Sequence, residues 1–256
     1  MRRLDHSMYA LGADGLPAEV TVGRRVWRLQ QTVKHDFFAA VGFYADDDGR
    51  QAVLKVGRTR AFHGVPMGFV GRWLTDRETR AYAKLAGVKG VPALIGRWGE
   101  AGFLHDYVPG APLRRGDVIP VDFFEHLMTL LETLRRAGLT YVDTNKPENV
   151  LLGTDDAPWL IDFQIHFDVV DIPALCRGTL GRWLLEMFHR SDVYHVLKHK
   201  RRFCPDRLTE AERQRLQRRS WPIRLHRFLT RPYFMLRRPM MKNARKQGRL
   251  APELSK

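Results

Sequence analysis

The chain has 256 residues, of which 44% are hydrophobic and 28% charged, so it is long enough to bury a large core and is not a wholly disordered protein. Its two cysteines, Cys176 and Cys204, form no C-x-x-C pair, which excludes a disulfide-stapled scaffold and a zinc ribbon and favours a reducing compartment. The net charge of +15 is uneven: residues 201–256 hold 17 Lys and Arg against 4 Asp and Glu, whereas residues 1–200 hold 26 against 24. We expect a nearly neutral folded body followed by a basic tail.

The sequence predicts neither a secretory signal nor a membrane-spanning helix. Residues 1–7 lead into no apolar segment, and no later stretch approaches the ~20 apolar residues that a span requires. We therefore expect a cytoplasmic protein.

The first half of the chain predicts an antiparallel sheet and one helix. Apolar or alternating runs of strand length are separated by turn residues. These runs cover residues 25–29, 37–44, 52–56, 92–97 and 102–107. Between the third and fourth runs, apolar residues near helical spacing predict a helix over residues 72–85, with Glu78 in its middle and Gly87 at its end.

The second half predicts mainly helices. A proline- and glycine-rich turn over residues 109–112 precedes a strong helix pattern over residues 123–136, which Gly138 ends. Two apolar runs within residues 150–161 predict a small hairpin. Further helices are expected over residues 180–187, 193–200 and 209–219, the last of which begins with a capping-box pattern from Thr209 to Glu212.

Charged and amide residues fall where a phosphoryl-transfer site would need them. Lys55 ends an apolar strand and Glu78 lies on the helix that follows, and a lysine held by a glutamate is an arrangement that clamps phosphate. Asn149 precedes the hairpin and Asp162 follows it, and a carboxylate and an amide brought together across a hairpin make an oxygen site suited to magnesium. Asp143 lies in the loop just before this pair.

These motifs resemble the protein-kinase-like superfamily, whose signature combines a strand lysine, a helix glutamate, H-R-D-x-K-P-x-N and D-F-G. Residues 146–149 read K-P-E-N, and Asp162 is followed by phenylalanine. The segment containing Asp106 and Tyr107 also resembles the hinge that receives adenine through backbone hydrogen bonds. The resemblance covers about residues 20–200 and is greatest to compact atypical branches: the RIO-type kinases and the bacterial lipopolysaccharide core kinases that phosphorylate Kdo or heptose. Small bacterial chains of this type are often labelled serine/threonine protein kinase-like.

The resemblance implies an α+β, two-lobed protein-kinase-like fold with a reduced helical C-lobe. It divides the chain in four parts. These are an N-terminal extension (residues 1–19), an N-lobe (20–108), a reduced C-lobe (109–205) and a basic C-terminal helical or tail segment (206–256).

The resemblance also implies ATP and Mg²⁺ as cofactors and a hydroxyl acceptor, either a lipid-linked sugar or a protein serine or threonine. Asp143 would accept or orient the proton of that hydroxyl, and Lys146 would stabilise the transferring phosphoryl group. Lys55 would bind the α- and β-phosphates, and Glu78 would orient Lys55. The magnesium ligands would be Asn149 and Asp162, and the hinge residues Asp106 and Tyr107 would bind the adenine.

Several positions depart from the family pattern. Tyr141 replaces the usual histidine, and Asp143 lies six residues before Asn149 instead of five. Residues 32–38, where a glycine-rich phosphate loop is expected, contain no glycine, so charge on Lys34 or His35 would have to compensate. Gln164 replaces the glycine of D-F-G. These departures leave a pseudokinase, acting as a nucleotide-binding or scaffold module at a membrane or nucleic acid, as the alternative function.

The segment after Asp162 is short. Only 30 residues separate it from Asp192, whose surroundings resemble the αF aspartate region of kinases, and no A-P-E motif intervenes. A reduced platform for protein substrates favours a sugar, a lipid or a specialised protein as acceptor.

Two basic features have more than one interpretation. His195 and His199 have a spacing that can bind zinc on one helix face, but neighbouring lysines and arginines favour a basic helix face. Residues 220–249 interleave aromatic side chains with arginines, which suits an anionic membrane surface and peripheral attachment to its cytoplasmic face. Nucleic acid is the competing partner, and a solvated tail is the third alternative.

Overall fold

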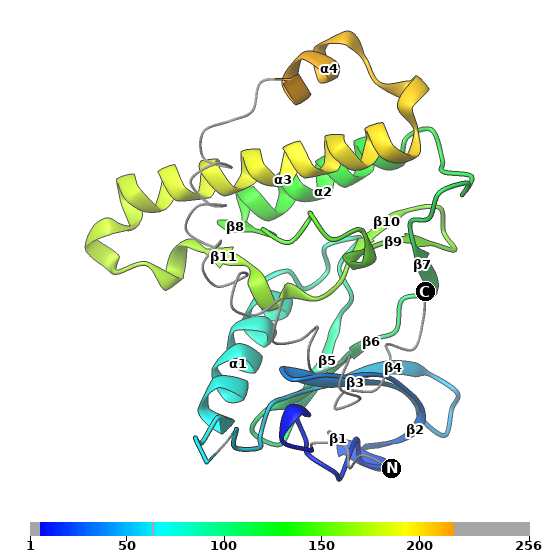
Figure 1. Ribbon diagram of the computed structural model, residues 1–256, viewed down its shortest axis with the longest axis vertical. Helices are drawn as coiled ribbons and strands as arrows, with labels where there is room; N and C mark the ends of the chain where they lie inside the picture. The colour runs from blue at the N-terminus through cyan, green and yellow to red at the C-terminus, as the bar shows by residue number, and fades with distance from the viewer. Residues whose placement is uncertain (1–5, 63, 218–256) are drawn as a thin grey trace. The chain divides into compact units, whose positions relative to one another are not determined.

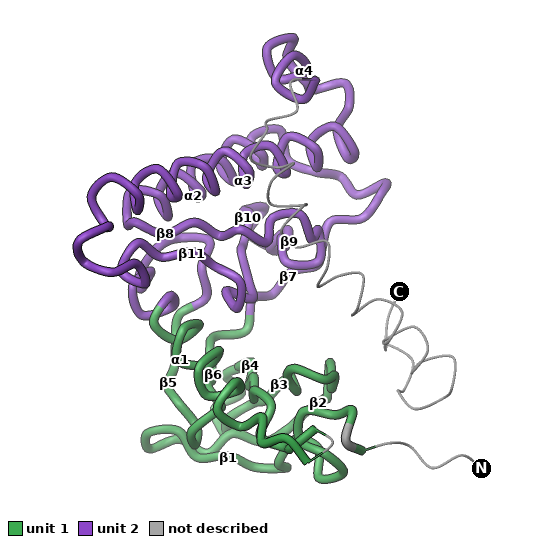
Figure 2. Tube along the Cα trace, turned by 60° about the vertical axis from the view of Figure 1, so that its left-hand side comes forward, with its two compact units in different colours: residues 1–80, 93–107, 230–256 green, residues 81–92, 108–229 purple. Residues whose placement is uncertain are grey.

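The computed structural model describes residues 6–62 and 64–217 (Figure 1). The basic and aromatic tail, for which membrane or nucleic-acid binding is expected, lies outside the described residues. The described chain forms two compact units (Figure 2). Unit 1 comprises residues 6–80 and 93–107, and unit 2 comprises residues 81–92 and 108–217.

Unit 1 is built on a six-stranded antiparallel sheet in the order β1-β2-β3-β4-β6-β5, which confirms the predicted antiparallel sheet. The strands are β1 (Glu19–Val22), β2 (Arg25–His35), β3 (Ala39–Ala45), β4 (Gln51–Gly57), β5 (Leu94–Trp98) and β6 (Gly102–Asp106). A short 3-10 turn, His6–Met8, precedes the sheet. Trp27, Tyr44, Leu54 and Leu104 are fully buried in its core. The apolar alternation of these strands thus places one face of the sheet inside the unit.

Helix α1 (Gly68–Lys84) confirms the predicted helix but begins earlier, at Gly68. Two glycines let it approach the end of β4. A Cβ on Gly71 would lie 2.1 Å from the carbonyl oxygen of Arg58, and a Cβ on Gly57 would lie 2.9 Å from the carbonyl oxygen of Gly71. Any larger residue would therefore push α1 away from β4, and the glycines set how closely Glu78 can come to the strand.

Unit 2 contains the long helices. Helix α2 (Phe123–Arg136) has the predicted bounds, and its apolar stripe, which includes Leu127 and Leu134, is buried. The prediction of two helices over residues 180–187 and 193–200 is wrong, because a single helix, α3 (Arg182–Phe203), spans both. No glycine or proline lies between the two predicted segments. The Asp192 side chain accepts hydrogen bonds from the N–H groups of Tyr141 and Val142 and so does not compete for the N–H groups of its own helix.

Small strands complete unit 2. The predicted hairpin is confirmed as β9 (Val150–Gly153) and β10 (Pro158–Leu160). The prediction of a turn over residues 109–112 is wrong, since β7 (Gly110–Pro112) pairs with β9 as a third antiparallel strand. Gly110 makes this pairing possible, because a Cβ there would lie 2.5 Å from the carbonyl oxygen of Leu152. A second pair joins β8 (Leu139–Thr140) to β11 (Phe167–Asp168).

Short helical turns connect these elements. They are η2 (Pro147–Asn149), η3 (Phe163–Ile165), η4 (Val169–Asp171), η5 (Ala174–Cys176), the π-helical turn η6 (Arg177–Gly181) and η7 (Pro205–Arg207). The last described helix is α4 (Glu210–Gln217), and the predicted end of this helix lies outside the described residues. Its capping box is confirmed: the Thr209 N–H donates to Glu212 Oε2 at 2.8 Å, and the Glu212 N–H donates to Thr209 Oγ1 at 3.3 Å. Within the described ranges, no helix is both long and apolar enough to cross a membrane.

Candidate active site

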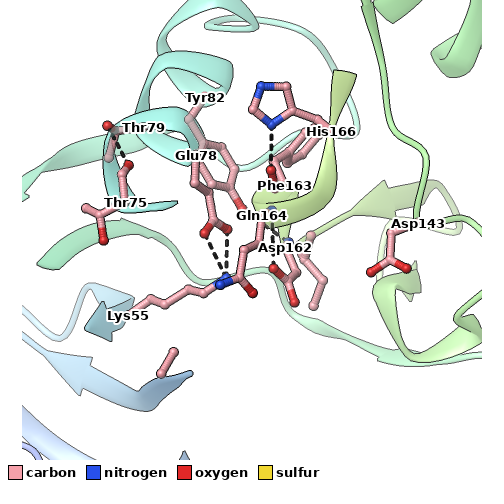
Figure 3. A network of polar contacts seen from close by, with 12 residues as sticks. Lys55, Thr75, Glu78, Thr79, Tyr82, Asp143, Asp162, Phe163, Gln164 and His166 are labelled. Atoms are coloured by element: carbon pink, nitrogen blue, oxygen red, sulfur yellow. Dashed lines mark hydrogen bonds and ion pairs between the residues drawn. The ribbon is translucent and has the colours of Figure 1, made fainter. Parts of the chain in front are cut away.

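Unit 1 brings Lys55 and Glu78 together as a buried ion pair. Lys55 lies on the central strand β4, opposite Val41 of β3 and Phe103 of β6. Its Nζ lies 2.9 Å from Oε1 and 2.8 Å from Oε2 of Glu78 on α1 (Figure 3). The two side chains are only 11% and 2% exposed. The strand and the helix therefore hold an ammonium group in a fixed position, as a phosphate clamp requires.

The expected hinge residues are fixed by contacts within unit 1. The Asp106 N–H donates to the carbonyl of Ala93 at 2.9 Å, and the Tyr107 N–H donates to the carbonyl of Gln51 at 3.3 Å. The Asp106 carboxylate accepts a hydrogen bond from Arg50 at 2.5 Å, and the Tyr107 ring lies edge-on to another aromatic ring. An adenine ring could use the N–H groups of Asp106 and Tyr107 only if these two backbone bonds opened.

The turn between β2 and β3, where a phosphate-covering loop was expected, is closed on itself. Oδ1 of Asp36 accepts hydrogen bonds from the N–H groups of Phe38 at 2.8 Å and Ala39 at 3.1 Å. Lys34 pairs with Asp36 at 2.8 Å. Burial alone would raise the pKa of Asp36, but Lys34 and the two N–H groups outweigh burial and lower it. The turn amides that a phosphate would need are thus already bonded to a carboxylate.

The N-terminal segment ties down the same turn. Leu11 donates its N–H to Nε2 of His35 at 3.1 Å, and Ala10 donates its N–H to the carbonyl of Asp36 at 2.8 Å. The ring of Tyr9 packs on the ring of His35, with centroids 4.9 Å apart. The structure therefore engages both residues that were expected to supply compensating charge, Lys34 and His35, in contacts within unit 1.

Unit 2 brings Asp143, Lys146 and Asn149 together. Oδ2 of Asp143 lies 2.5 Å from Lys146 Nζ and 3.0 Å from Asn149 Nδ2. The extra residue in this loop is accommodated by successive turns, since the Lys146 N–H donates to the Asp143 carbonyl and the Asn149 N–H donates to the Lys146 carbonyl. Burial raises the pKa of Asp143 and the nearby Asp162 adds to the rise, while Lys146 and Asn149 oppose it. A raised pKa makes a carboxylate a better proton acceptor.

Asp162 follows β10 in a left-handed conformation, with φ of 65°. Its backbone N–H donates to the hydroxyl of Tyr82 at 3.3 Å, and its Oδ1 accepts from the Gln164 N–H at 3.4 Å (Figure 3). The next residue, Phe163, is buried edge-on between Tyr82 and Tyr141, with ring centroids 5.1 and 5.0 Å away. Aromatic packing on one side and turn hydrogen bonds on the other therefore fix the backbone that carries the Asp162 carboxylate.

The donor chemistry of Asn149 and Asp162 suits Mg²⁺. The Ile161 N–H donates to the Asn149 carbonyl at 3.1 Å, which joins the backbones that carry the two side chains. Asn149 uses its amide nitrogen on Asp143, so its amide oxygen remains the end suited to a cation. In the described part of the chain, no group of three or more His, Cys, Asp or Glu side chains could hold a metal. Two protein oxygens would therefore need phosphate and water oxygens to complete a magnesium shell.

Asp192 supports the loop that carries Asp143. Its buried carboxylate accepts hydrogen bonds from the N–H groups of Tyr141 and Val142, both at 3.0 Å, and from the Thr144 hydroxyl at 2.8 Å. Burial raises the pKa of Asp192 to about 7, although these three bonds act in the opposite direction. The resemblance drew attention to Asp192 but did not say what it contacts.

His199 contacts the loop that carries Asp143, and the sequence did not predict this contact. Its Nε2 lies 2.6 Å from the carbonyl oxygen of Thr144, and burial lowers its pKa. The predicted basic helix face does not extend to His199 and Lys200, since both are buried and Lys200 pairs with Glu212. His199 lies seven residues after Asp192, on the same face of α3. Only a prediction of one continuous helix would have placed the two together.

Comparison with known proteins identifies the fold. No family model matches the sequence, and no curated protein sequence matches it. Among solved structures, RIO2 kinase from Chaetomium thermophilum is similar with a TM-score of 0.50 and 18% identity, covering 83% of this chain and 73% of that chain. Its ADP/Mg²⁺-phosphoaspartate complex has a TM-score of 0.49 and 18% identity, covering 82% and 70%. The BubR1 kinase domain has a TM-score of 0.46 and 14% identity, covering 71% and 65%.

The similarity to the RIO2 kinase structure with a TM-score of 0.50 confirms the fold class. The chain has a protein-kinase-like α+β fold, with an antiparallel sheet in one unit and the long helices in the other. At such low identity the similarity establishes the fold alone, and the resemblance to bacterial lipopolysaccharide core kinases stays a prediction.

Proposed function

We propose that the protein is a kinase, a phosphotransferase that moves the γ-phosphate of ATP to a hydroxyl group with the help of Mg²⁺. The observation that carries the proposal is the buried Lys55–Glu78 pair on a protein-kinase-like fold. Burying two charges loses their hydration, and a buried ion pair often stabilises a protein no better than apolar residues would. A pair with both side chains almost fully buried is therefore better explained by a task, and phosphate binding by Lys55 oriented by Glu78 is the task that suits it.

The proposed chemistry in unit 2 follows from its hydrogen bonds. Asp143 would accept or orient the proton of the acceptor hydroxyl, which its raised pKa favours. Lys146 would leave Asp143 to stabilise charge on the phosphoryl group, since its side chain is 43% exposed and able to move. Asn149 and Asp162 would hold Mg²⁺, which when bound would neutralise phosphate charge. The backbone of Asp106 and Tyr107 would contact the adenine once the bonds from their N–H groups to the carbonyls of Ala93 and Gln51 open.

The acceptor class is a lipid-linked sugar or a protein serine or threonine. The short segment between Asp162 and Asp192 leaves little room for a broad protein-docking platform, which favours the smaller acceptor. A cytoplasmic location with peripheral attachment to a membrane would bring the enzyme to a lipid-linked acceptor, and the basic tail supports this through its composition. Nucleic acid is the less favoured partner of the tail.

A specific observation favours a second candidate, the pseudokinase. The amides of Phe38 and Ala39 are bonded to Asp36, and Lys34 and His35 are engaged elsewhere. A turn that offers no backbone amides to phosphate would bind nucleotide without positioning it for transfer. This protein would then act as a nucleotide-binding or scaffold module.

A thermal-shift titration with ATP, with and without Mg²⁺, tests the nucleotide site. Ligand at 100 times its Kd stabilises a protein by ~2.7 kcal/mol, and we expect the Mg²⁺-dependent part of the shift to disappear in Asp162→Asn. The matched control is Asp156→Asn, because Asp156 also has a left-handed backbone, with φ of 61°, and lies in the turn of the hairpin that Asp162 follows. An equal effect of both substitutions would contradict the metal assignment.

Phosphate transfer separates the two candidate functions. With γ-labelled ATP and membrane or protein fractions as acceptors, a kinase would label an acceptor, and Asp143→Asn would abolish labelling while leaving the thermal shift largely intact. Thermal shift without labelling in any fraction would favour the pseudokinase. Labelling retained in Asp143→Asn would exclude Asp143 as the base.

A further inference from the structure

Large apolar side chains are exposed along one segment of unit 2, residues 165–183, which we call the apolar loop. It runs from the last residue of η3 through β11, η4, η5 and η6 to the start of α3. The exposed residues are Ile165 (51%), Val170 (47%), Leu175 (101%), Leu180 (46%) and Trp183 (47%). Single exposed apolar residues are normal on protein surfaces, but five large ones within nineteen residues make this segment a candidate interaction surface.

The apolar loop has a defined conformation that displays these side chains. Arg177 Nε donates to the carbonyl of Ile172 and its Nη2 to the carbonyl of Val170, both at 2.8 Å. Arg182 Nε donates to the carbonyl of Gly178 at 2.7 Å. Ile172 is buried and fixes the loop to the unit. Figure 1 shows the segment as a yellow-green loop that extends past the amino end of α3.

The apolar loop holds two Asp and two Arg, and the two signs lie in different parts of it: Asp168, which pairs with Lys84 at 2.7 Å, and Asp171 precede the buried Ile172, whereas both arginines follow it. Residues 172–185 contain Arg177 and Arg182 and no Asp or Glu, and both arginines are exposed. Of the flanking acidic residues, Glu186 is paired with Arg135 at 2.6 Å. Exposed leucine side chains flanked by arginine and tryptophan suit the boundary between lipid headgroups and acyl chains. At this boundary apolar side chains insert and cationic side chains contact anionic headgroups.

Two observations favour a bilayer over a protein partner. Leu175 is fully exposed, so no neighbouring group forms a wall of a groove around it, and a fluid bilayer can receive such a side chain without a matching pocket. The tail beyond the described residues adds a second attraction of the same sign, since residues 218–256 hold 12 Lys and Arg against 1 Glu. Stable membrane attachment generally takes two such signals together.

We infer that the apolar loop docks on an anionic lipid surface, with Leu175, Leu180 and Trp183 inserted and Arg177 and Arg182 at the headgroups. The inference does not depend on phosphate transfer, because it concerns a surface and not the candidate active site. It assigns to a folded element of unit 2 a contact that the sequence suggested only for the tail.

Vesicle sedimentation of the full chain tests the inference. Vesicles of phosphatidylcholine alone are compared with vesicles that also contain phosphatidylglycerol, and we expect binding only to the anionic ones. The double variant Leu175→Asp/Leu180→Asp should lower the partition constant at least tenfold. The matched control is Val118→Asp/Val121→Asp, which makes the same chemical change at side chains that are 92% and 81% exposed.

The control residues lie on a separate part of unit 2. Arg207 donates a hydrogen bond to the carbonyl of Ile119 at 2.7 Å, which places the loop around Val118 and Val121 beside the segment that follows the carboxyl end of α3. The apolar loop lies at the amino end of that helix. We expect the control variant to bind within twofold of the natural sequence, and both variants to keep its melting temperature.

Three outcomes would overturn the inference. Equal losses in both double variants would show that only net charge matters. Absence of binding to anionic vesicles would rule out a lipid surface as the partner of the apolar loop. The third outcome uses a full-length variant in which five tail arginines are changed to Gln: Arg224, Arg227, Arg231, Arg237 and Arg238. If this tail variant loses vesicle binding while Leu175→Asp/Leu180→Asp keeps it, the tail alone makes the membrane contact.

Discussion

Asp192 on α3 accepts a hydrogen bond from the hydroxyl of Thr144 at 2.8 Å, and Thr144 directly follows the proposed base. The same carboxylate holds the N–H of Val142, which has a left-handed φ of 66°. That conformation is strained for a β-branched residue and persists only where surrounding contacts impose it. Asp192 therefore fixes the backbone on both sides of Asp143.

Replacement of Asp192 by Asn should change how stability depends on pH. The pKa of Asp192 is about 7 in the folded protein against an ordinary 3.8, so between these values the folded state holds a proton that the unfolded state has lost. This carboxyl group therefore adds stability as the pH falls from about 7 to about 4. In urea titrations, the unfolding free energy of the natural protein relative to Asp192→Asn should rise as the pH is lowered from 8 to 5. A pH-independent difference would contradict the raised pKa.

Breaking the buried pair should strongly destabilise unit 1. Lys55→Met leaves Glu78 as a buried charge without its ammonium partner, which typically costs about 3–5 kcal/mol. Lys55→Met/Glu78→Leu removes both charges and should cost less than Lys55→Met alone. Lys34→Met is the control, because the Lys34 side chain is 50% exposed and Asp36, at 22% exposed, would keep its two N–H donors after the pair is lost, so the cost should be smaller. Urea denaturation measures all three, and equal costs for Lys34→Met and Lys55→Met would contradict the argument.

Gly71→Ala should move α1 away from β4. The added Cβ would meet the Arg58 carbonyl oxygen at 2.1 Å, and overpacking of this kind costs about 1–3 kcal/mol. Gly68→Ala, on the same helix, meets only the Thr59 carbonyl oxygen at 3.5 Å and should be neutral or stabilising by up to about 1 kcal/mol. Thermal unfolding compares the two variants, and similar melting temperatures would refute the close approach.

Acidification should open the contact between the N-terminal segment and the β2–β3 turn. Nε2 of His35 accepts the Leu11 N–H, so protonation of the ring removes the acceptor. Burial lowers the pKa of His35, which means that the bond adds stability above the ordinary value of 6.5 and that this stability is lost as the pH falls through the lowered pKa. Amide hydrogen exchange, corrected for its intrinsic pH dependence, should show protection of Leu11 decreasing on acidification. The Ala10 amide is the internal control, because its acceptor is the Asp36 carbonyl, which does not titrate.

Periodicity was enough to predict the sheet of unit 1, α1, α2 and the β9–β10 hairpin, because each of these is specified by its own apolar pattern. The strand at Gly110 was missed because its pairing depends on Leu152, more than 40 residues away, and its sequence alone is typical of a turn. The division of α3 into two helices had a similar cause. Asp192 is a poor helix residue by propensity, and only its bonds to residues 141–144 explain its place in a helix.

The proposed site residues were found through the kinase-like motifs, whose spacing is visible along the chain. The supporting contacts were not, because they come from residues whose types have many ordinary uses. His199 belonged to a pair with zinc-binding spacing, and its bond to the Thr144 carbonyl depends on the packing of α3. Nothing in the sequence around Asp36 predicts that its carboxylate accepts hydrogen bonds from the amides of Phe38 and Ala39, and only the structure shows these bonds.

The closed turn around Asp36 changes the thermodynamics expected of ligand binding. A glycine-rich loop becomes ordered when it closes over a nucleotide, and this ordering opposes binding through lost conformational entropy. In this protein the amides of Phe38 and Ala39 are bonded to Asp36, and the N-terminal segment holds the turn. Nucleotide binding would therefore lose little entropy in this turn, and its affinity would depend on the charges of Lys55 and the bound cation more than on closure of a flexible flap.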